Sequence, residues 1–311
     1  MRIAVIGTGI IGKRHLEAIS KSNHCVLDCV CDINEEQART YAEIYQVPYF
    51  TDYHDIPGKT QADAVILNLP HWLHCEVTEF FLNSGLHVLV EKPMAMTKAE
   101  CDRMIEAAKR NNKKLAVGHP QRFFAVNRKV KEICQSGELG KLCMITEYRA
   151  VDYFAAKRPK WFLDKKLSGG GITMNLGAHA LDKTFYITDS RPEEIFASVN
   201  NFKNDCNIEA HSQILIKLKN QVTASYTFGG YSSVGNELIY YFTNGALKVA
   251  GTSKLWKRTD SEWIEVPLVK EGDNLSLQLE AFYQYVNDQP SEIPTGEYGA
   301  DVIAAIEKIY S

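Results

Sequence analysis

Near the N-terminus, glycines recur at a spacing that suits a dinucleotide phosphate. Gly7, Gly9 and Gly12 form a G-x-G-x-x-G pattern directly after the apolar run 2–6. In this context the first glycine makes a tight turn, the second lets the backbone approach a pyrophosphate, and the third lets helix and strand pack closely. The N-terminus of the following helix then offers free N–H groups to the phosphate oxygens.

An acidic residue extends this pattern. Asp32 ends the next apolar run, about 20 residues past the last glycine, where an acid binds the ribose 2′-hydroxyl. Because a carboxylate there repels the 2′-phosphate of NADP, the pattern favours NAD over NADP. We expect cofactor contacts from Gly7, Thr8, Gly9, Ile10, Ile11, Gly12 and Asp32.

A lysine is held where parallel sheets bind ligands. Lys92 lies between Glu91 and Pro93, just past a predicted strand. A following proline disfavours the α region, so Lys92 lies on an extended backbone. In open α/β sheets the carboxyl ends of the strands bind the ligand. The sequence therefore predicts that Lys92 serves the site, and a solvated loop lysine is the alternative.

A glycine-rich segment carries the second group of polar residues. Glycines at 169–171 lead into Asn175, His179 and Asp182. Consecutive glycines cost folding entropy, so we expect the backbone to approach something closely there, and a ligand is our expectation. On a helix, Asn175 and His179 share one face, and Asp182 lies near the same flank.

Alternating elements support a first domain at residues 1–120. Buried-type runs alternate with helical signals, as expected for a parallel, doubly wound α/β sheet. Caps are predicted at Asn34 with Gln37 and at Thr97 with Glu100, and Gly85 suits the end of a helix. The predicted strands are 2–6, 26–31, 64–69, 87–90 and 115–118, and the helices 11–22, 76–83 and 97–112.

The pattern of predicted elements changes in the second half, residues 121–311. Strand patterns there follow one another with few helices, which predicts an α+β domain with a largely antiparallel sheet. Asn244-Gly245 is a strong hairpin signal, because both residues tolerate positive φ. One of the helices at the C-terminal end of this half could pack against the first domain. Strands are predicted at 142–151, 194–200, 211–218, 222–228, 237–243 and 246–249, and helices at 275–288 and 297–310.

Taken together, these motifs resemble the glucose-fructose oxidoreductase / inositol dehydrogenase (Gfo/Idh/MocA) family over the whole chain. The resemblance rests on GTGIIG, Asp32, Pro70 with His74, EKP at 91–93, and GGG followed by N-x-G-x-H-x-x-D. It implies a Rossmann NAD-binding domain and a substrate-binding, oligomer-forming domain. The implied reaction oxidises a secondary alcohol of a sugar, inositol or sugar acid, with hydride transfer to the nicotinamide.

The resemblance implies catalytic roles for Lys92, His179 and Asn175. An imidazole suits a general base near neutral pH, so His179 would take the hydroxyl proton. A protonated Lys92 would stabilise the developing alkoxide, and Lys92 as the base is the alternative. Much of the family has Asp where this chain has Asn175, and an amide can only orient by hydrogen bonds. An inactive NAD-binding sensor therefore remains an alternative. An NAD-dependent glycosidase is a second alternative, because the family that this chain resembles includes such enzymes.

Further site residues follow from the same resemblance. Arg122 and Trp161 are expected on the substrate wall, beside Asn175 and His179. Basic residues from 157 to 166 suit an anionic substrate, with a solvated loop as the alternative. His74 has a structural alternative, and His15 and His119 are expected to be structural. Additional cofactor contacts are expected from Leu69, Pro70, His74, Glu91 and Lys92.

Composition excludes several classes of function. With a net charge of −3, the chain has no basic field for nucleic acid. We read neither a signal peptide nor a membrane span. None of the eight cysteines forms a Cys-x-x-Cys pair, so we expect free thiols in a reducing cytoplasm and no metal site. An exposed antiparallel sheet face favours a homodimer or homotetramer.

Overall fold

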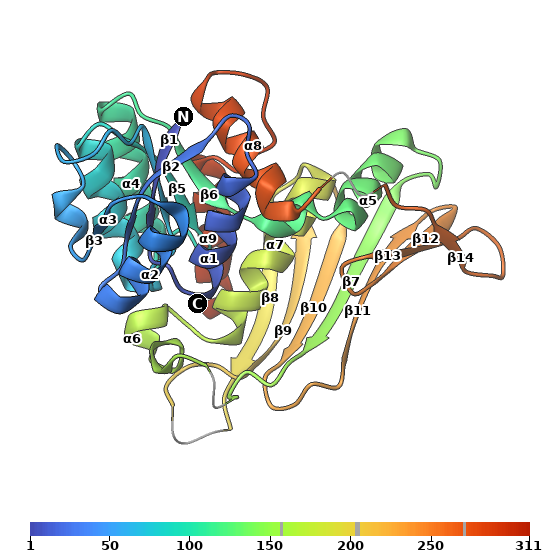
Figure 1. The fold of residues 1–311 in the computed structure, drawn as a ribbon. Helices are drawn as coiled ribbons and strands as arrows, with labels where there is room; N and C mark the ends of the chain where they lie inside the picture. Colours follow the sequence, from blue (N-terminus) through green and yellow to red (C-terminus); the bar gives the residue numbers. More distant parts are fainter. Residues whose placement is uncertain (156–157, 203–205, 270–271) are drawn as a thin grey trace. The chain divides into compact units, whose positions relative to one another are not determined.

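The chain folds into two compact units, Met1–Pro120 with Gly272–Ala300 and Gln121–Glu271 with Asp301–Ser311 (Figure 1). The structure is a computed structural model, and it describes residues 1–155, 158–202, 206–269 and 272–311. The segment that contains the penultimate helix thus belongs to the first unit.

A six-stranded parallel sheet forms the centre of the first unit. The strand order is β3-β2-β1-β4-β5-β6, and every neighbouring pair is parallel. The central strands are apolar and buried on both faces, as the continuous runs predict. This confirms the predicted doubly wound sheet. The strands are β1 Arg2–Ile6, β2 Val26–Cys31, β3 Tyr49–Phe50, β4 Ala64–Leu67, β5 His87–Glu91 and β6 Leu115–Gly118.

Helices flank this sheet, and their caps test the predicted boundaries. Thr97 and Glu100 form the predicted capping box, whereas Asn34 caps its helix through the Gln37 N–H without a reciprocal bond from the Gln37 side chain. The third helix begins at His71, not at residue 76, because Pro70 already stands at its N-cap. The helices are α1 Ile10–Ser20, α2 Glu35–Tyr45, η1 Tyr53–Asp55, α3 His71–Asn83, α4 Lys98–Arg110 and α8 Asn274–Val286.

The second unit contains an eight-stranded sheet in the order β14-β13-β12-β11-β7-β10-β9-β8. Its neighbouring pairs are antiparallel except β7 with β10, which confirms the predicted largely antiparallel sheet. The sequence analysis missed the edge strand β14 and its neighbour β13. The strands are β7 Leu142–Ala150, β8 Pro192–Asn200, β9 His211–Leu218, β10 Thr223–Gly229, β11 Gly235–Phe242, β12 Gly245–Ala250, β13 Lys254–Arg258 and β14 Ile264–Val266.

The predicted hairpin joins β11 to β12, but its turn differs from the expectation. Phe242 pairs with Gly245, so Thr243 and Asn244 form the loop. Gly245 has φ +158°, whereas Asn244 is not among the residues with positive φ. Gly245 is needed for a second reason: a Cβ there would lie 2.4 Å from the Arg258 carbonyl oxygen.

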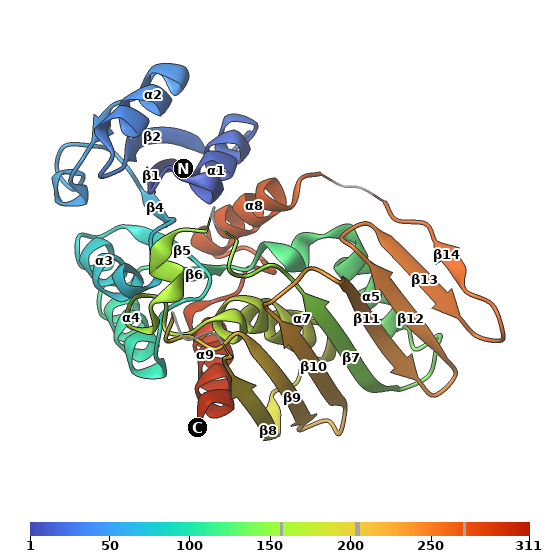
Figure 2. The same ribbon diagram turned by 90° about the horizontal axis from the view of Figure 1, so that it is seen from below.

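Helices cover one face of this second sheet (Figure 2). The Lys183 ammonium contacts the Glu147 carboxylate of β7 at 2.6 Å, and the Thr184 hydroxyl contacts the Tyr226 hydroxyl of β10 at 2.6 Å. Both contacts come from α7, which therefore lies on the buried face. The helices are η2 Pro120–Phe123, α5 Ala125–Ser136, η3 Lys160–Leu163, α6 Lys165–Ser168, the π-helical turn η4 Thr173–Gly177, α7 Ala178–Thr188 and α9 Gly296–Tyr310. In the described part of the chain, no helix is both long and apolar enough to span a bilayer.

Candidate active site

The glycine loop after β1 has the geometry that its spacing predicts. Gly7 has φ +84°, and a Cβ there would lie 2.5 Å from the Asn68 carbonyl oxygen. A Cβ at Gly12 would lie 2.0 Å from the Gly7 carbonyl oxygen. A side chain at either position would displace backbone, so both glycines are required for the turn and for the close packing of α1.

Gly9 differs from these two glycines because the space beside it is open. A Cβ there would meet no atom within 4 Å. Gly9 is the N-cap of α1, and no side chain caps the helix. The N–H groups of the first turn are thus available to an anion, and no acidic residue opposes it. With Ile10 85% exposed at the same end, this loop fits a dinucleotide phosphate.

Asp32 is fastened to this loop. Its Oδ2 atom accepts hydrogen bonds from the Thr8 N–H at 2.8 Å and the Thr8 hydroxyl at 2.9 Å, and from the Gln37 amide at 3.1 Å. Its Oδ1 atom accepts one from the Asn34 N–H at 2.9 Å, which leaves acceptor capacity for a ribose hydroxyl. The sequence analysis missed Gln37 here, and also Ile33, which is 93% exposed beside Asp32.

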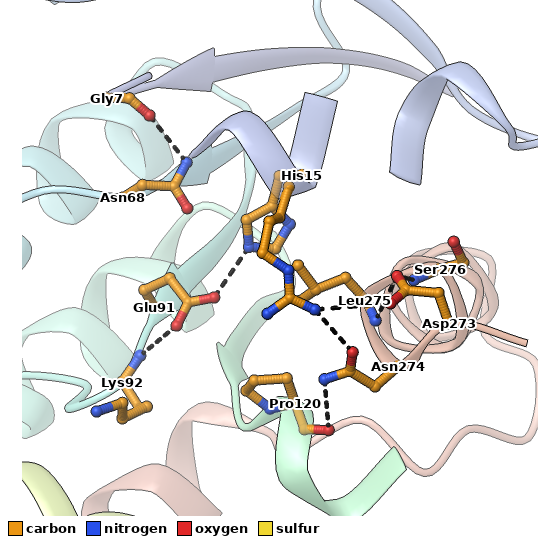
Figure 3. Close-up of polar contacts among 11 residues, drawn as sticks. Gly7, His15, Asn68, Glu91, Lys92, Pro120, Asp273, Asn274, Leu275 and Ser276 are labelled. Carbon is orange, nitrogen blue, oxygen red and sulfur yellow. Dashed lines mark hydrogen bonds and ion pairs between the residues drawn. The ribbon is translucent and has the colours of Figure 1, made fainter. Parts of the chain in front are cut away.

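The loops after β1, β4 and β5 are joined at one edge of the sheet. The order of strands reverses between β1 and β4, and there the Asn68 amide donates to the Gly7 carbonyl at 3.2 Å (Figure 3). His74 is completely buried, and its two ring nitrogens lie 2.8 Å from the Leu69 and Pro93 carbonyl oxygens. Burial lowers the pKa of His74. These contacts favour the structural alternative for His74, as a tie between the loops that follow β4 and β5.

Lys92 lies in the last of these loops, half-buried, directly after β5. Its backbone N–H donates to the Glu91 carboxylate at 3.3 Å, and the other oxygen of that carboxylate contacts His15 (Figure 3). The expected cofactor-site residues of the first unit thus gather at the carboxyl edge of its sheet, the usual ligand position.

In the second unit, Asn175 and His179 stand out by their exposure. From 170 to 187, a stretch that the structure describes in full, they are the two residues that are not buried. One lies in η4 and the other in α7, four residues apart on continuous helical turns. The predicted common face is therefore the accessible face of this segment.

Two of the three glycines in this segment contact protein closely and the third ends a helix, which corrects the expected approach to a ligand. Gly169 has φ +76° and ends α6. A Cβ would lie 2.1 Å from the Tyr310 hydroxyl at Gly170 and 2.1 Å from the Glu209 carbonyl oxygen at Gly171. The bare backbone therefore serves close packing within the second unit.

A buried carboxylate holds the start of this helical segment. Glu209 accepts hydrogen bonds from the Gly171 N–H at 2.7 Å, the Thr173 N–H at 2.8 Å and the Tyr310 hydroxyl at 2.8 Å. A negative charge at free N–H groups of a first helical turn is stabilising. Sequence patterns missed Glu209 and Tyr310, because they are far from the glycines in the chain.

Tyr153 is a further residue that the sequence analysis missed. Its side chain is completely buried, and it lies close to the Asn175 side chain. Burial raises the pKa of Tyr153, and the Asn175 contact opposes that rise. A neutral phenol therefore lies beside the amide of Asn175.

Two predicted residues of this region are buried instead of accessible. Asp182 has no exposed surface, and it forms an ion pair with Arg122, which is 5% exposed. The Arg122 guanidinium also lies over the Tyr186 ring. Asp182 therefore does not share the accessible flank with His179, and the placement of Arg122 favours a structural role over a substrate contact.

Trp161 and the basic segment lie closer to the surface. Trp161 is half-buried and stacks on Phe162 at 3.8 Å between ring centroids. Lys160, Lys165 and Lys166 are exposed, which favours the solvated-loop alternative. Lys157, part of the predicted basic cluster, lies outside the described residues.

Searching the described residues for a metal centre finds no suitable group of three or more His, Cys, Asp or Glu. The cysteines are free thiols: five are buried, two are half-buried and Cys143 is exposed. Lys92 belongs to the first unit and His179 to the second, so their meeting at one substrate is a proposal.

Comparison with known proteins identifies the family. Residues 1–119 match the "Oxidoreductase family, NAD-binding Rossmann fold", and residues 127–252 match the "GFO/IDH/MocA C-terminal domain". The chain therefore belongs to the Gfo/Idh/MocA family and contains an NAD-binding Rossmann domain, as its motifs predicted.

Named relatives include dehydrogenases of polyols and sugars. The chain is 31% identical to myo-inositol 2-dehydrogenase of Thermotoga maritima over 63% of this chain and 58% of the relative. It is 32% identical to D-glucoside 3-dehydrogenase of Escherichia coli, over 60% and 54%. The chain thus spans little more than half the length of these relatives. A crystal structure of aldose-aldose oxidoreductase from Caulobacter crescentus has the same fold, with a TM-score of 0.92, 23% identity, and coverage of 100% and 96%.

Proposed function

We propose that the protein is an NAD-dependent dehydrogenase that oxidises a secondary alcohol of a sugar, inositol or sugar acid. The observation that carries the proposal is the selective exposure of Asn175 and His179 in an otherwise buried segment. A base and an amide on the accessible side of a segment whose first N–H groups are bound by Glu209 suit a reacting site better than a structural helix. The named relatives support the substrate class.

Each polar group has a role in this reaction. His179 takes the proton of the substrate hydroxyl, and Lys92, from the loop after β5, stabilises the developing alkoxide. Asn175, which lies beside Tyr153, orients the substrate by hydrogen bonds. NAD, bound at the glycine loop and Asp32, supplies the hydride acceptor. The Asp32 carboxylate disfavours the 2′-phosphate of NADP, so NAD is the proposed cofactor.

The test is NADH formation, followed by absorbance, with a panel of inositols, aldoses and sugar acids. Replacing His179 by Ala should lower kcat by about 10²–10⁴-fold, the usual contribution of a general base. His54→Ala is the matched control, because the His54 side chain is 55% exposed. A loss of less than about tenfold would instead favour Lys92 as the base.

Two other functions give different results in the same assay. Asn175 lacks the charge of the Asp common in the family, which favours an NAD-binding sensor as the second candidate. That protein would bind NAD and turn over no alcohol. An NAD-dependent glycosidase would release sugar without net NADH.

The proposed assembly is a homo-oligomer formed through the open face of the second sheet. Phe196 is 61% exposed and Leu215 49% exposed, and the two are paired across β8 and β9. The same row continues to Ser225 on β10. The exposed pair Phe196 and Leu215 supports the proposal, because exposed apolar patches favour association.

A further inference from the structure

A buried, hydrogen-bonded pair of side chains lies next to Lys92 in the first unit. His15, on α1, is 1% exposed, and its Nε2 atom lies 2.9 Å from Oε1 of Glu91, whose side chain is 12% exposed (Figure 3). Because a carboxylate only accepts hydrogen bonds, His15 donates through Nε2. We call these two residues the His15–Glu91 pair.

The pair reaches the backbone of Lys92. The second oxygen of Glu91 accepts the Lys92 N–H at 3.3 Å. α1 begins directly after the glycine loop, so one carboxylate connects the helix that faces the cofactor phosphate with the residue that carries the proposed amine (Figure 3).

A glycine on the neighbouring strand β6 leaves space for the His15–Glu91 pair. A Cβ at Gly118, on β6, would lie 2.9 Å from Glu91 Oε1 and 3.4 Å from the Gln278 amide nitrogen. A side chain at this position of β6 would displace the carboxylate. Gly118 thus leaves room for Glu91 in the interior of the unit.

Stability alone does not account for this arrangement. Gln278 has no exposed surface, and within the described residues neither polar atom of its side chain, nor Nδ1 of His15, has a hydrogen-bond partner. Buried polar groups without partners, and buried charges, destabilise a fold relative to apolar packing. Such departures from a well-satisfied core are expected at functional sites.

We propose that His15 and Glu91 are positioning residues that fix Lys92 relative to the bound dinucleotide. The inference rests on the proposed function for the role of Lys92. The inference itself makes two claims. Displacing the Glu91 carboxylate moves the Lys92 backbone, and the position of α1 affects Lys92 through the contact of His15 with Glu91.

Arg14 provides a matched control on the same helix. Its guanidinium donates to Asn274 Oδ1 at 2.9 Å and lies 3.6 Å from Asp273, at the start of α8. Asn274 in turn donates to the Pro120 carbonyl at 3.3 Å. Arg14 therefore fastens α1 to α8, whereas His15 fastens α1 to the Lys92 loop.

The experiment compares Glu91→Ala, His15→Ala, His15→Gln and Arg14→Ala in the full chain. It measures the Kd for NADH by fluorescence, the rate of Lys92 modification by an amine reagent with and without NADH, and kcat with KM. We expect His15→Ala and Glu91→Ala to lower kcat about 10- to 100-fold with KM nearly unchanged, since a displacement of about 1 Å is worth up to about 10²-fold. The rate of Lys92 modification should also change in these two variants. The Kd for NADH should change less than about threefold.

His15→Gln should recover part of the loss, because its amide can donate to Glu91. Arg14→Ala should leave Lys92 reactivity and kcat close to the parent values. If His15→Ala and Arg14→Ala have equal effects on both readouts, the pair is only structural and the inference is wrong. Thermal unfolding identifies any variant that does not fold, and His15→Gln then decides the outcome.

Failure of the proposed function would look different. In that case no alcohol is turned over by the parent protein, whereas the modification rate of Lys92 still reports whether the pair positions it. An unchanged Lys92 rate in His15→Ala overturns the inference whether or not the protein is a dehydrogenase.

Discussion

Asp32 has two tasks in the structure, and only one of them concerns the cofactor. It accepts hydrogen bonds from Thr8 of the glycine loop, and it presents its other oxygen where a ribose is expected. A substitution therefore affects both the loop and the choice of cofactor.

Replacing Asp32 by Ser should narrow the preference for NAD over NADP, because removing the negative charge relieves repulsion of the 2′-phosphate. We expect the ratio of kcat/KM for the two cofactors to fall by about tenfold or more, equivalent to about 1.4 kcal/mol. Gln37→Ala serves as the control, since it loosens the same loop and keeps the charge. If the ratio of kcat/KM for NAD and NADP is unchanged in Asp32→Ser, this carboxylate does not discriminate between a 2′-hydroxyl and a 2′-phosphate.

At the scale of elements, the glycine-rich segment that precedes η4 allows close packing. Gly171 lets the Glu209 backbone approach the segment, and the Glu209 carboxylate then binds its free N–H groups. The exposure of Asn175 and His179 thus depends on contacts from distant parts of the chain.

Gly171→Ala should reduce the free energy of unfolding by about 1–3 kcal/mol, the usual cost of overpacking. Gly177→Ala is the matched control within the same segment. Its Cβ would meet only ordinary contacts, at 3.5 Å or more. Alanine there should be neutral or stabilising by about 1 kcal/mol. Urea denaturation checks both, and equal effects would contradict the packing role of Gly171.

β5 begins with a histidine that makes stability depend on pH. Burial, with the nearby charges of Lys113 and Lys114, lowers the pKa of His87 to about 4. The neutral ring accepts the Lys114 N–H at 2.9 Å. In the unfolded chain the pKa is about 6.5. Between these two values the unfolded state binds the proton and the folded state does not, so this contribution to stability is complete above about pH 6.5 and is lost as the pH falls toward 4.

We therefore expect the unfolding midpoint to fall as the pH is lowered from about 6.5 toward 4. The fall should be shallower in His87→Asn, whose side-chain oxygen can still accept the Lys114 N–H. Ile44→Ala, at an exposed site with no titratable side chain, should retain the parental slope. Buried His74 acts in the same direction, so part of the dependence should remain. Identical slopes for His87→Asn and the parent would contradict the assignment.

At the scale of the whole molecule, the proposed association through the second sheet is testable. Phe196→Glu places a charge in the apolar row of the open face, and it should convert the oligomer to a smaller species in light scattering. Ile44→Glu is the control, because Ile44 is 62% exposed on α2 of the other unit. A parent protein that is monomeric, or an oligomer that survives Phe196→Glu, would contradict the proposal.

The sequence by itself determined the parallel sheet of the first unit and the glycine loop. Continuous apolar runs, capping residues and closely spaced glycines act over a few residues, so their physical consequences are visible locally. The common face of Asn175 and His179 also followed from helical periodicity.

Only the tertiary structure decided what these local features contact. Gly170 packs against Tyr310 and Gly171 against Glu209, Arg122 is buried against Asp182, and Glu91 contacts His15. These pairs join residues from distant elements of the chain, and no local periodicity encodes them. They form because burying a charged or polar group is favourable only when a partner meets it, and the complete fold selects that partner.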